Sequence, residues 1–87
     1  LLPMRESKYQ RRLRTEYEKE GAITLKLDPR SSMIEKGFPD LLVILKDGRV
    51  RFIEAKAEDG VVSPAQQHQH NRLRAMGHEV LVVRAKE

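Results

Sequence analysis

Cysteine is missing from this chain of 87 residues, and its absence excludes a disulfide framework and any metal site built on thiolates. Tryptophan is also missing, and two tyrosines and two phenylalanines are too few for base stacking to dominate nucleic-acid binding. No apolar run approaches the ~18 residues that a membrane span requires, and the amino terminus carries no signal-peptide core. We therefore expect a cytoplasmic protein with no membrane partner.

The charge balance is basic, with 17 lysines and arginines against 13 aspartates and glutamates. A basic domain attracts polyanions, and nucleic acid is the commonest of them. Much of the excess lies in residues 5–19, where the same charges also fit a solvated helix with ion pairs four residues apart. Charge therefore suggests a partner but specifies no chemistry.

The length predicts one domain over residues 1–87. One interpretation of residues 1–3, which precede Met4, is an appended remnant. The hydrophobic fraction of 39% and the charged fraction of 34% are typical of a folded domain. Because a domain of this size buries only about 60% of its unfolded surface, a second copy would stabilise it.

Hydrophobic periodicity predicts the element order α-β-β-β-α-β. Tyr9, Leu13 and Tyr17 fall on one stripe of a helix, and the alternation from Ala22 to Asp28 predicts a strand with one solvated side. The polar residues 66–71 on the second helix are expected to cover a site or a partner rather than a core. The expected helices span residues 4–20 and 64–76, and the expected strands span residues 22–28, 41–45, 50–57 and 79–84.

Two acidic residues stand at unusual places. Asp40 immediately precedes an apolar strand, and Glu54 lies inside a strand that should be mostly buried. Carboxylates rarely occupy such positions unless they are paired or bound to a cation.

The register of the hairpin decides whether these two carboxylates meet. A three-residue loop with Gly48 in the left-handed conformation would pair Leu45 with Arg49 and place Asp40 opposite Glu54, with Lys56 on the same face. A two-residue loop would shift the pairing by one residue and separate the carboxylates. We favour the first register because it gathers the charged groups.

Such a cluster suits a hard cation. Two carboxylates, a backbone carbonyl and waters are ligands that Mg²⁺ or Mn²⁺ accepts, and Lys56 would orient the attacking water or stabilise charge on the phosphate. The alternative is a structural ion pair of Lys56 with Glu54 or Asp40, with Pro39-Asp40 serving only as a turn.

The wider pattern resembles a nuclease family. Pro39-Asp40 followed by Glu54-x-Lys56 is the PD-(D/E)XK pattern. Over nearly its whole length the chain resembles the virus-type replication–repair nuclease (VRR-NUC) branch of that superfamily. The segments that carry this resemblance are Gly37-Phe38-Pro39-Asp40-Leu41, Phe52-Ile53-Glu54-Ala55-Lys56, Ser63-Pro64-x-Gln66, Leu73 and Gly77.

The resemblance implies a small restriction-endonuclease-like α/β (α+β) domain, with a mixed sheet flanked by helices, that hydrolyses phosphodiesters with Mg²⁺ or Mn²⁺. It implies that Asp40, Glu54 and the carbonyl of Ala55 bind the metal. It also implies catalytic roles for Asp40, Glu54, Lys56 and Gln66. The family also carries an acidic residue on its first helix, which is a further candidate metal ligand. Glu6 matches that place best, with Gln10 one turn further on.

Several of these assignments have plainer alternatives. Gln66 completes a capping box with Ser63, and Glu6 is one of several glutamates on a basic helix. His68 and His70 are two residues apart on a helix and point in different directions, which argues against a zinc site, although His70 shares the face of Gln66. Candidate contacts to nucleic acid are Lys8, Arg11, Arg12, Arg30, Lys36 and Arg72.

The predicted function is metal-dependent cleavage of branched DNA by a homodimer. Stand-alone members of the family, typically encoded by phages, resemble enzymes selective for four-way junctions, which implies a bacterial cell or phage-infected host and a helicase or other repair protein as partner. Cutting both strands needs two sites, hence two copies. The alternatives are a flap or duplex nuclease, a catalytically silent nucleic-acid-binding module, and a structural or partner-binding protein.

Overall fold

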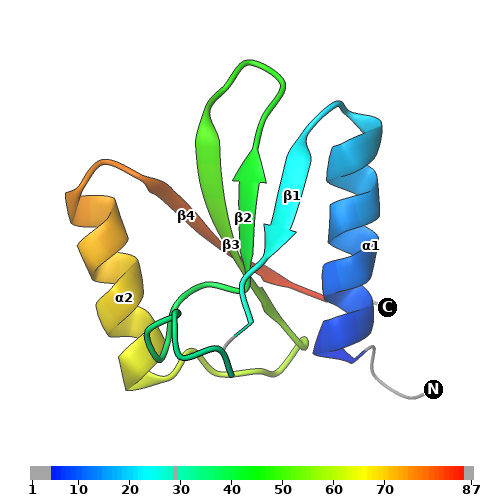
Figure 1. The fold of residues 1–87 in the computed structure, drawn as a ribbon. Helices are drawn as coiled ribbons and strands as arrows, with labels where there is room; N and C mark the ends of the chain where they lie inside the picture. Colours follow the sequence, from blue (N-terminus) through cyan, green and yellow to red (C-terminus); the bar gives the residue numbers. More distant parts are fainter. Residues whose placement is uncertain (1–4, 29, 86–87) are drawn as a thin grey trace.

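The computed structural model describes residues 5–28 and 30–85, so the remnant proposed at residues 1–3 lies outside the described residues. The elements follow the predicted order, and the two helices flank one sheet (Figure 1). The predicted helix over 4–20 and strand over 22–28 are shorter than expected, whereas the last strand has the predicted bounds. The elements are α1 (Glu6–Lys19), β1 (Ile23–Lys26), β2 (Leu41–Ile44), β3 (Val50–Lys56), α2 (Pro64–Ala75) and β4 (Glu79–Arg84).

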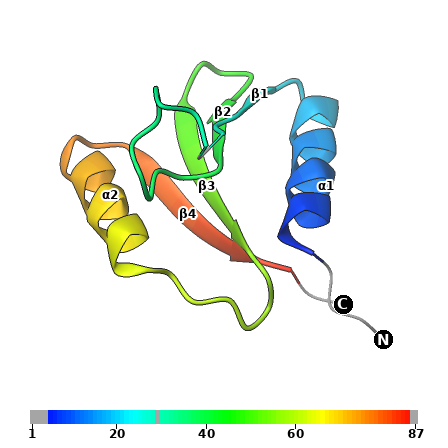
Figure 2. The same ribbon diagram turned by 60° about the horizontal axis from the view of Figure 1, so that its bottom comes forward.

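The four strands form a mixed sheet in the order β1-β2-β3-β4. β1, β2 and β3 are antiparallel neighbours, while β3 and β4 run parallel because the chain returns through α2 between them. α1 and α2 lie on opposite sides of the sheet (Figure 2). Among the described residues, no helix is long and apolar enough to cross a membrane.

Each helix covers its own apolar cluster. On the α1 side, Leu41, Val43 and Ile53 are fully buried and pack against Leu13 and Tyr17. On the α2 side, Phe52 and Val80 of the sheet pack against Leu73 of the helix. The central strands are therefore covered on both faces, as the continuous apolar run at residues 41–45 predicted.

Buried and exposed side chains alternate along β1 as predicted, but the side that faces solvent is the one that carries the large apolar residues. Ala22 and Thr24 are buried, whereas Ile23 is 59% exposed and Leu25 is 47% exposed. α1 contacts β1 on the buried side, and α2 contacts β4 at the opposite edge of the sheet. The second face of β1 therefore lies beyond the reach of α2.

Candidate active site

The β2–β3 hairpin has the register that brings the two carboxylates together. Leu41 pairs with Ile53 in the sheet, and the Leu45 amide donates to the Arg49 carbonyl at 2.8 Å across a turn whose Gly48 has φ +91°. Continuing this register by one residue places Asp40 opposite Glu54. The prediction of a three-residue loop is confirmed.

Asp40 is fixed where β2 begins. Its carbonyl accepts a hydrogen bond from the Leu27 amide at 2.8 Å, which ties it to the end of β1. Its Oδ2 accepts a hydrogen bond from the Ala55 amide at 2.9 Å, so the carboxylate lies directly beside β3. The half-buried Asp40 side chain therefore faces both the sheet and solvent.

Among the described residues, Glu54 is the most deeply buried acidic side chain. Its side chain is 1% exposed in the middle of β3. Burial first, and then the hydrogen bond and charge of Asp40, raise the pKa of Glu54 to about 9 against the opposing charge of Lys56. A nearby cation would reverse this shift, because it stabilises the carboxylate form.

His70 is the neighbour of Glu54 that the sequence did not single out. It is fully buried on α2, and its Nε2 lies 3.2 Å from Glu54 Oε1. Burial lowers the pKa of His70, and the charges of Arg74 and Lys56 lower it too, so the contact is a hydrogen bond of a neutral imidazole rather than an ion pair. The available signal was the four-residue spacing from Gln66, which puts both residues on one helical face.

Lys56 lies two residues beyond Glu54 on the same face of β3 and is 8% exposed. The turn that follows the strand packs onto its aliphatic stem, since a side chain at Gly60 would begin only 3.3 Å from Lys56 Cδ. The structure thus brings Asp40, Glu54 and Lys56 to one end of the sheet, as the sequence predicted.

The chemistry of this group fits a hard divalent cation. The Lys56 carbonyl accepts a hydrogen bond from the Ala85 amide, on the β4 side of β3. Because successive residues of a strand direct their backbone groups to opposite sides, the amide and the carbonyl of Ala55 point to the other side, where Asp40 lies. Within residues 5–28 and 30–85 no three acidic, histidine or cysteine side chains gather as a metal site. The predicted ligand set, Asp40, Glu54 and the Ala55 carbonyl, would supply three oxygen donors, one of them from the backbone.

Gln66 is engaged in the alternative role that the sequence left open. Its side-chain Oε1 accepts a hydrogen bond from the Ser63 backbone amide at 2.9 Å, and its backbone amide donates to Ser63 Oγ at 3.1 Å. This capping box holds the first turn of α2. Its catalytic role stays a prediction.

Glu6 is the first residue of α1, and its side chain is exposed. Its charge contributes to the raised pKa of Glu54, which places the start of α1 on the side of the carboxylates. Gln10, one turn further on, lines a hollow together with Asp40. A metal-binding role for Glu6 stays a prediction.

α2 also holds the loop that leads into Asp40. Gln69 donates to Glu35 Oε2 at 3.3 Å and to the Lys36 carbonyl at 3.2 Å. Gly37 has φ +88°, and a Cβ there would lie 2.4 Å from the Ala65 carbonyl oxygen. Only glycine allows this approach of the loop to the helix.

The predicted nucleic-acid contacts differ in their surroundings. Arg72 lies 2.6 Å from Glu35 and also bonds Gln69, so it belongs to the anchor of the loop. Arg12 pairs with Glu16 at 3.5 Å, and Arg30 pairs with Asp28 at 3.2 Å. The remaining three are exposed at the surface: Lys8, Arg11 and Lys36.

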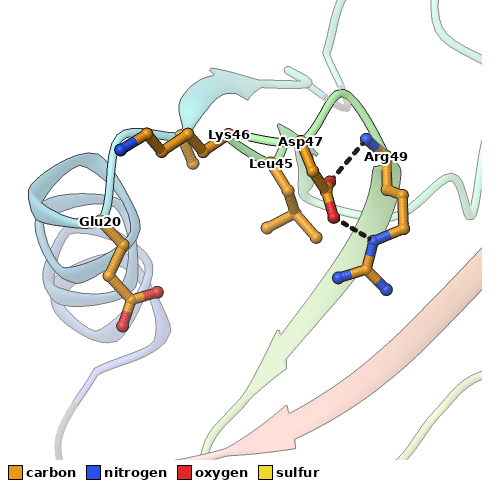
Figure 3. A pocket seen from close by; sticks show the side chains of 6 residues that line it. Glu20, Leu45, Lys46, Asp47 and Arg49 are labelled. Atoms are coloured by element: carbon orange, nitrogen blue, oxygen red, sulfur yellow. Dashed lines mark hydrogen bonds and ion pairs between the residues drawn. The ribbon is translucent and has the colours of Figure 1, made fainter.

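A separate hollow of ≈ 350 Å³ lies at the other end of the sheet, near the end of α1 (Figure 3). Ala22 and Leu45 contribute apolar atoms to it, and both Asp47 oxygens bond Arg49, through its amide at 3.0 Å and its Nε at 2.8 Å. The Asp47 carboxylate is thus paired with Arg49 and, unlike that of Glu54, is exposed to solvent.

The mixed sheet and its paired acids define the PD-(D/E)XK class of nucleases. Within that class, the model of the VRR-NUC domain matches residues 6–87, and the chain belongs to this family. A solved structure of a VRR-NUC domain is 36% identical, with a TM-score of 0.81, and the match covers 92% of this chain and 84% of that one.

A phage protein agrees with this assignment, and a further solved structure shares the fold. "Putative nuclease p44" of Acyrthosiphon pisum secondary endosymbiont phage 1 is 36% identical over 84 residues, which are 97% of this chain and 87% of that protein. Hjc, a Holliday junction resolvase of the archaeal hyperthermophile Archaeoglobus fulgidus, shares the fold with a TM-score of 0.66 at 21% identity. That match covers 90% of this chain and 65% of that one.

Proposed function

We propose that this protein is an endonuclease that hydrolyses DNA phosphodiesters with Mg²⁺ or Mn²⁺ and prefers four-way junctions. The observation that carries the proposal is the placement of Glu54, a buried carboxylate opposite Asp40 with a pKa of about 9. Two carboxylates in one buried site repel each other, and a divalent cation between them removes this cost. Membership in a nuclease family supplies the reaction class.

Each residue then has a definite task. Asp40, Glu54 and the Ala55 carbonyl would hold the cation, which when bound polarises a phosphoryl oxygen and lowers the pKa of a water ligand. The Ala55 amide and His70 keep the two carboxylates in place. The ammonium group of Lys56 stabilises the negative charge that develops on the phosphate, from a site where burial strengthens its effect.

The junction preference and the oligomeric state belong together. One chain holds one such site, and resolving a four-way junction requires cuts in two strands, so the functional unit would be a homodimer. The fold is shared with a junction resolvase, and a phage protein is among the relatives. This function implies the cytoplasm of a bacterial or phage-infected cell and a helicase or other repair protein that delivers branched DNA.

The test is cleavage of a labelled four-way junction, a flap and a linear duplex with Mg²⁺, Mn²⁺ or EDTA. Glu54→Ala and Lys56→Ala should each lose cleavage, while Glu58→Ala, which removes an exposed glutamate of the following turn, should cleave normally. Symmetric, metal-dependent cuts in the junction are expected. Preferred cutting of flaps or duplex would overturn the substrate, and binding without cleavage in every metal would overturn the reaction in favour of a silent binding module.

A further inference from the structure

The carboxylates of the site are reached from one side. Glu54 is 1% exposed and Lys56 is 8% exposed, so neither offers an open approach to a polymer. Asp40 is half-buried, and it lines a hollow of ≈ 190 Å³ between the start of α1 and the end of β1. A phosphate that is to reach Glu54 must therefore come past Asp40.

This hollow continues away from Asp40 into a longer depression. A second hollow of ≈ 100 Å³ shares Ser7, Gln10 and Lys26 with the first one. Together they run between α1 and the edge strand β1. We call this depression the basic furrow. Besides Asp40, its lining residues are Ser7, Gln10, Arg11, Arg14, Lys26, Leu27, Asp28 and Arg30.

The helical residues of the furrow share one face of α1. Positions 7, 10, 11 and 14 follow the spacing of three and four residues that defines a helical face. The Nε of Arg14 donates to the buried Thr24 Oγ1 at 3.0 Å, which holds this guanidinium against the sheet. Lys26 comes from β1, where it pairs with Leu41, the residue after Asp40.

Arg30 pairs with Asp28 at 3.2 Å within the furrow, and the other three cations of the furrow are available for a ligand. Within the described part of the chain, none of the ion pairs involves Arg11, Arg14 or Lys26. Elsewhere on the surface, Arg12, Arg49 and Arg72 each face a carboxylate within 4 Å. The exposed hydroxyl of Ser7 and the amide of Gln10 add neutral donors between these cations.

We infer that the basic furrow binds the sugar-phosphate backbone of the strand that is cut and guides it to Asp40. From Ser7 to Arg14 the helix rises about 10 Å, roughly the axial length of three nucleotides of one strand in a duplex. Of the two carboxylates in the lining, Asp28 is paired with Arg30 and Asp40 belongs to the site itself. The remaining polar groups are cations and hydrogen-bond donors, and no side chain of the lining is aromatic, so the furrow would contact phosphates and not stack on bases. This inference rests on the proposed DNA substrate.

A pair of matched double variants tests the furrow. Arg11→Ala with Lys26→Ala removes two cations from it. Lys19→Ala with Lys46→Ala removes the same charge at the opposite end of the sheet, where the side chains of Glu20 and Lys46 line another hollow (Figure 3). All four side chains are exposed, so both variants should keep the thermal unfolding midpoint of the unaltered protein.

The first measurement is junction affinity in EDTA as a function of salt, which does not depend on cleavage. The logarithm of the association constant falls linearly with the logarithm of the salt concentration. In the furrow variant this negative slope should become shallower by roughly 1.4 to 1.8, at about 0.7–0.9 per lost phosphate contact. The control variant should leave the slope within error of the unaltered protein. Equal slopes in the two variants would overturn the inference while leaving the nuclease proposal standing. No binding by the unaltered protein would overturn both.

The second measurement asks which strand lies in the furrow. Neutral methylphosphonate linkages are placed beside the cut, in the cleaved strand or in its complement. In the cleaved strand their effect on affinity should largely vanish in the furrow variant, since the same contacts are already lost. Additive losses in the cleaved strand, or coupling to the complement, would overturn the assignment of the furrow to the cut strand.

Discussion

A single proton on Glu54 links the site to the stability of the protein. Without a cation the buried side chain has a pKa of about 9, far above the ordinary 4.5 of a glutamate in an unfolded chain. Between these two values the folded protein holds a proton that the unfolded chain has released. Binding of a cation must displace this proton, so cation binding and pH are coupled.

The resulting prediction concerns the metal-free protein. Because the folded state binds the extra proton, its free energy of unfolding should fall as the pH rises from about 4.5 toward 9. Thermal unfolding in EDTA at pH values from about 5 to about 9 measures this effect. Mn²⁺ should flatten the profile, and Glu54→Gln should remove the Glu54 contribution in either condition. An unchanged profile in Glu54→Gln would contradict the prediction.

His70 gives a second prediction at this scale. His70→Ala removes the hydrogen-bond partner of Glu54, the proposed metal ligand, so Mn²⁺ affinity should fall by about 10- to 100-fold. The unfolding free energy should fall by about 1–3 kcal/mol because a buried polar group loses its hydrogen bond. His70→Gln, which keeps an N–H donor, should recover part of the affinity, and His68→Ala on the exposed face of α2 should change neither quantity.

Calorimetric titration with Mn²⁺ and denaturant unfolding separate the two effects of His70→Ala. A loss of stability with unchanged Mn²⁺ affinity would mean that the histidine only fills space. A loss of both, with recovery in His70→Gln, would identify it as a positioning residue for Glu54.

Among the elements, the register of the β2–β3 hairpin could be predicted from the sequence, whereas the way α2 packs across the site could not. Gly48 after Asp47 indicated a turn, and one turn length followed from requiring Asp40 and Glu54 to meet. The contact of His70 with Glu54 depends on how α2 lies across the sheet, which no local pattern encodes. The exposed side of β1 was missed for the same reason, because alternation marks two faces but does not say which helix covers them.

The approach of the 35–40 loop to α2 yields a prediction at the scale of elements. Gly37→Ala would strain a backbone with φ +88° and drive Cβ into the Ala65 carbonyl, so it should cost about 2–4 kcal/mol of unfolding free energy. Mn²⁺ affinity should fall as well, because this loop places Asp40. Gly48→Ala is the control: its φ is +91° but its Cβ meets nothing within 4 Å, so only about 1–2 kcal/mol is expected.

Denaturant unfolding of both variants measures the difference. Equal costs for Gly37→Ala and Gly48→Ala would show that the loop yields freely to the added methyl group. A larger cost at Gly37 alone would show that the loop and the first turn of α2 act as one rigid support for Asp40.

For the whole molecule, the proposed homodimer predicts how mixed subunits behave. If each copy cuts one strand, a dimer of one unaltered and one Glu54→Ala subunit should nick the junction and fail to resolve it. Purified mixed dimers and a supercoiled cruciform substrate distinguish nicked circles from linear product. Complete resolution by mixed dimers would show that one site cuts both strands, and a monomer by sedimentation at working concentration would contradict the dimer itself.

The turn at residues 46–48 has a consequence for how this protein can change by mutation. β2 is apolar at every position, so its sequence does not favour one face over the other, and the turn decides which way the strand faces. Replacing Lys46-Asp47-Gly48 by Asn-Gly, the strongest two-residue turn, would favour a slip by one residue. Asp40 would then face away from Glu54, although the turn lies about 17 Å along the strand from it.

The altered protein is expected to keep a cooperative unfolding transition and to lose Mn²⁺ binding. Loss of folding would instead mean that packing under the helices fixes the register without help from the turn. Rebuilding this turn with one residue fewer, far from the predicted catalytic residues, would thus turn the proposed nuclease into a folded protein without catalysis. A new binding protein could begin from such an event.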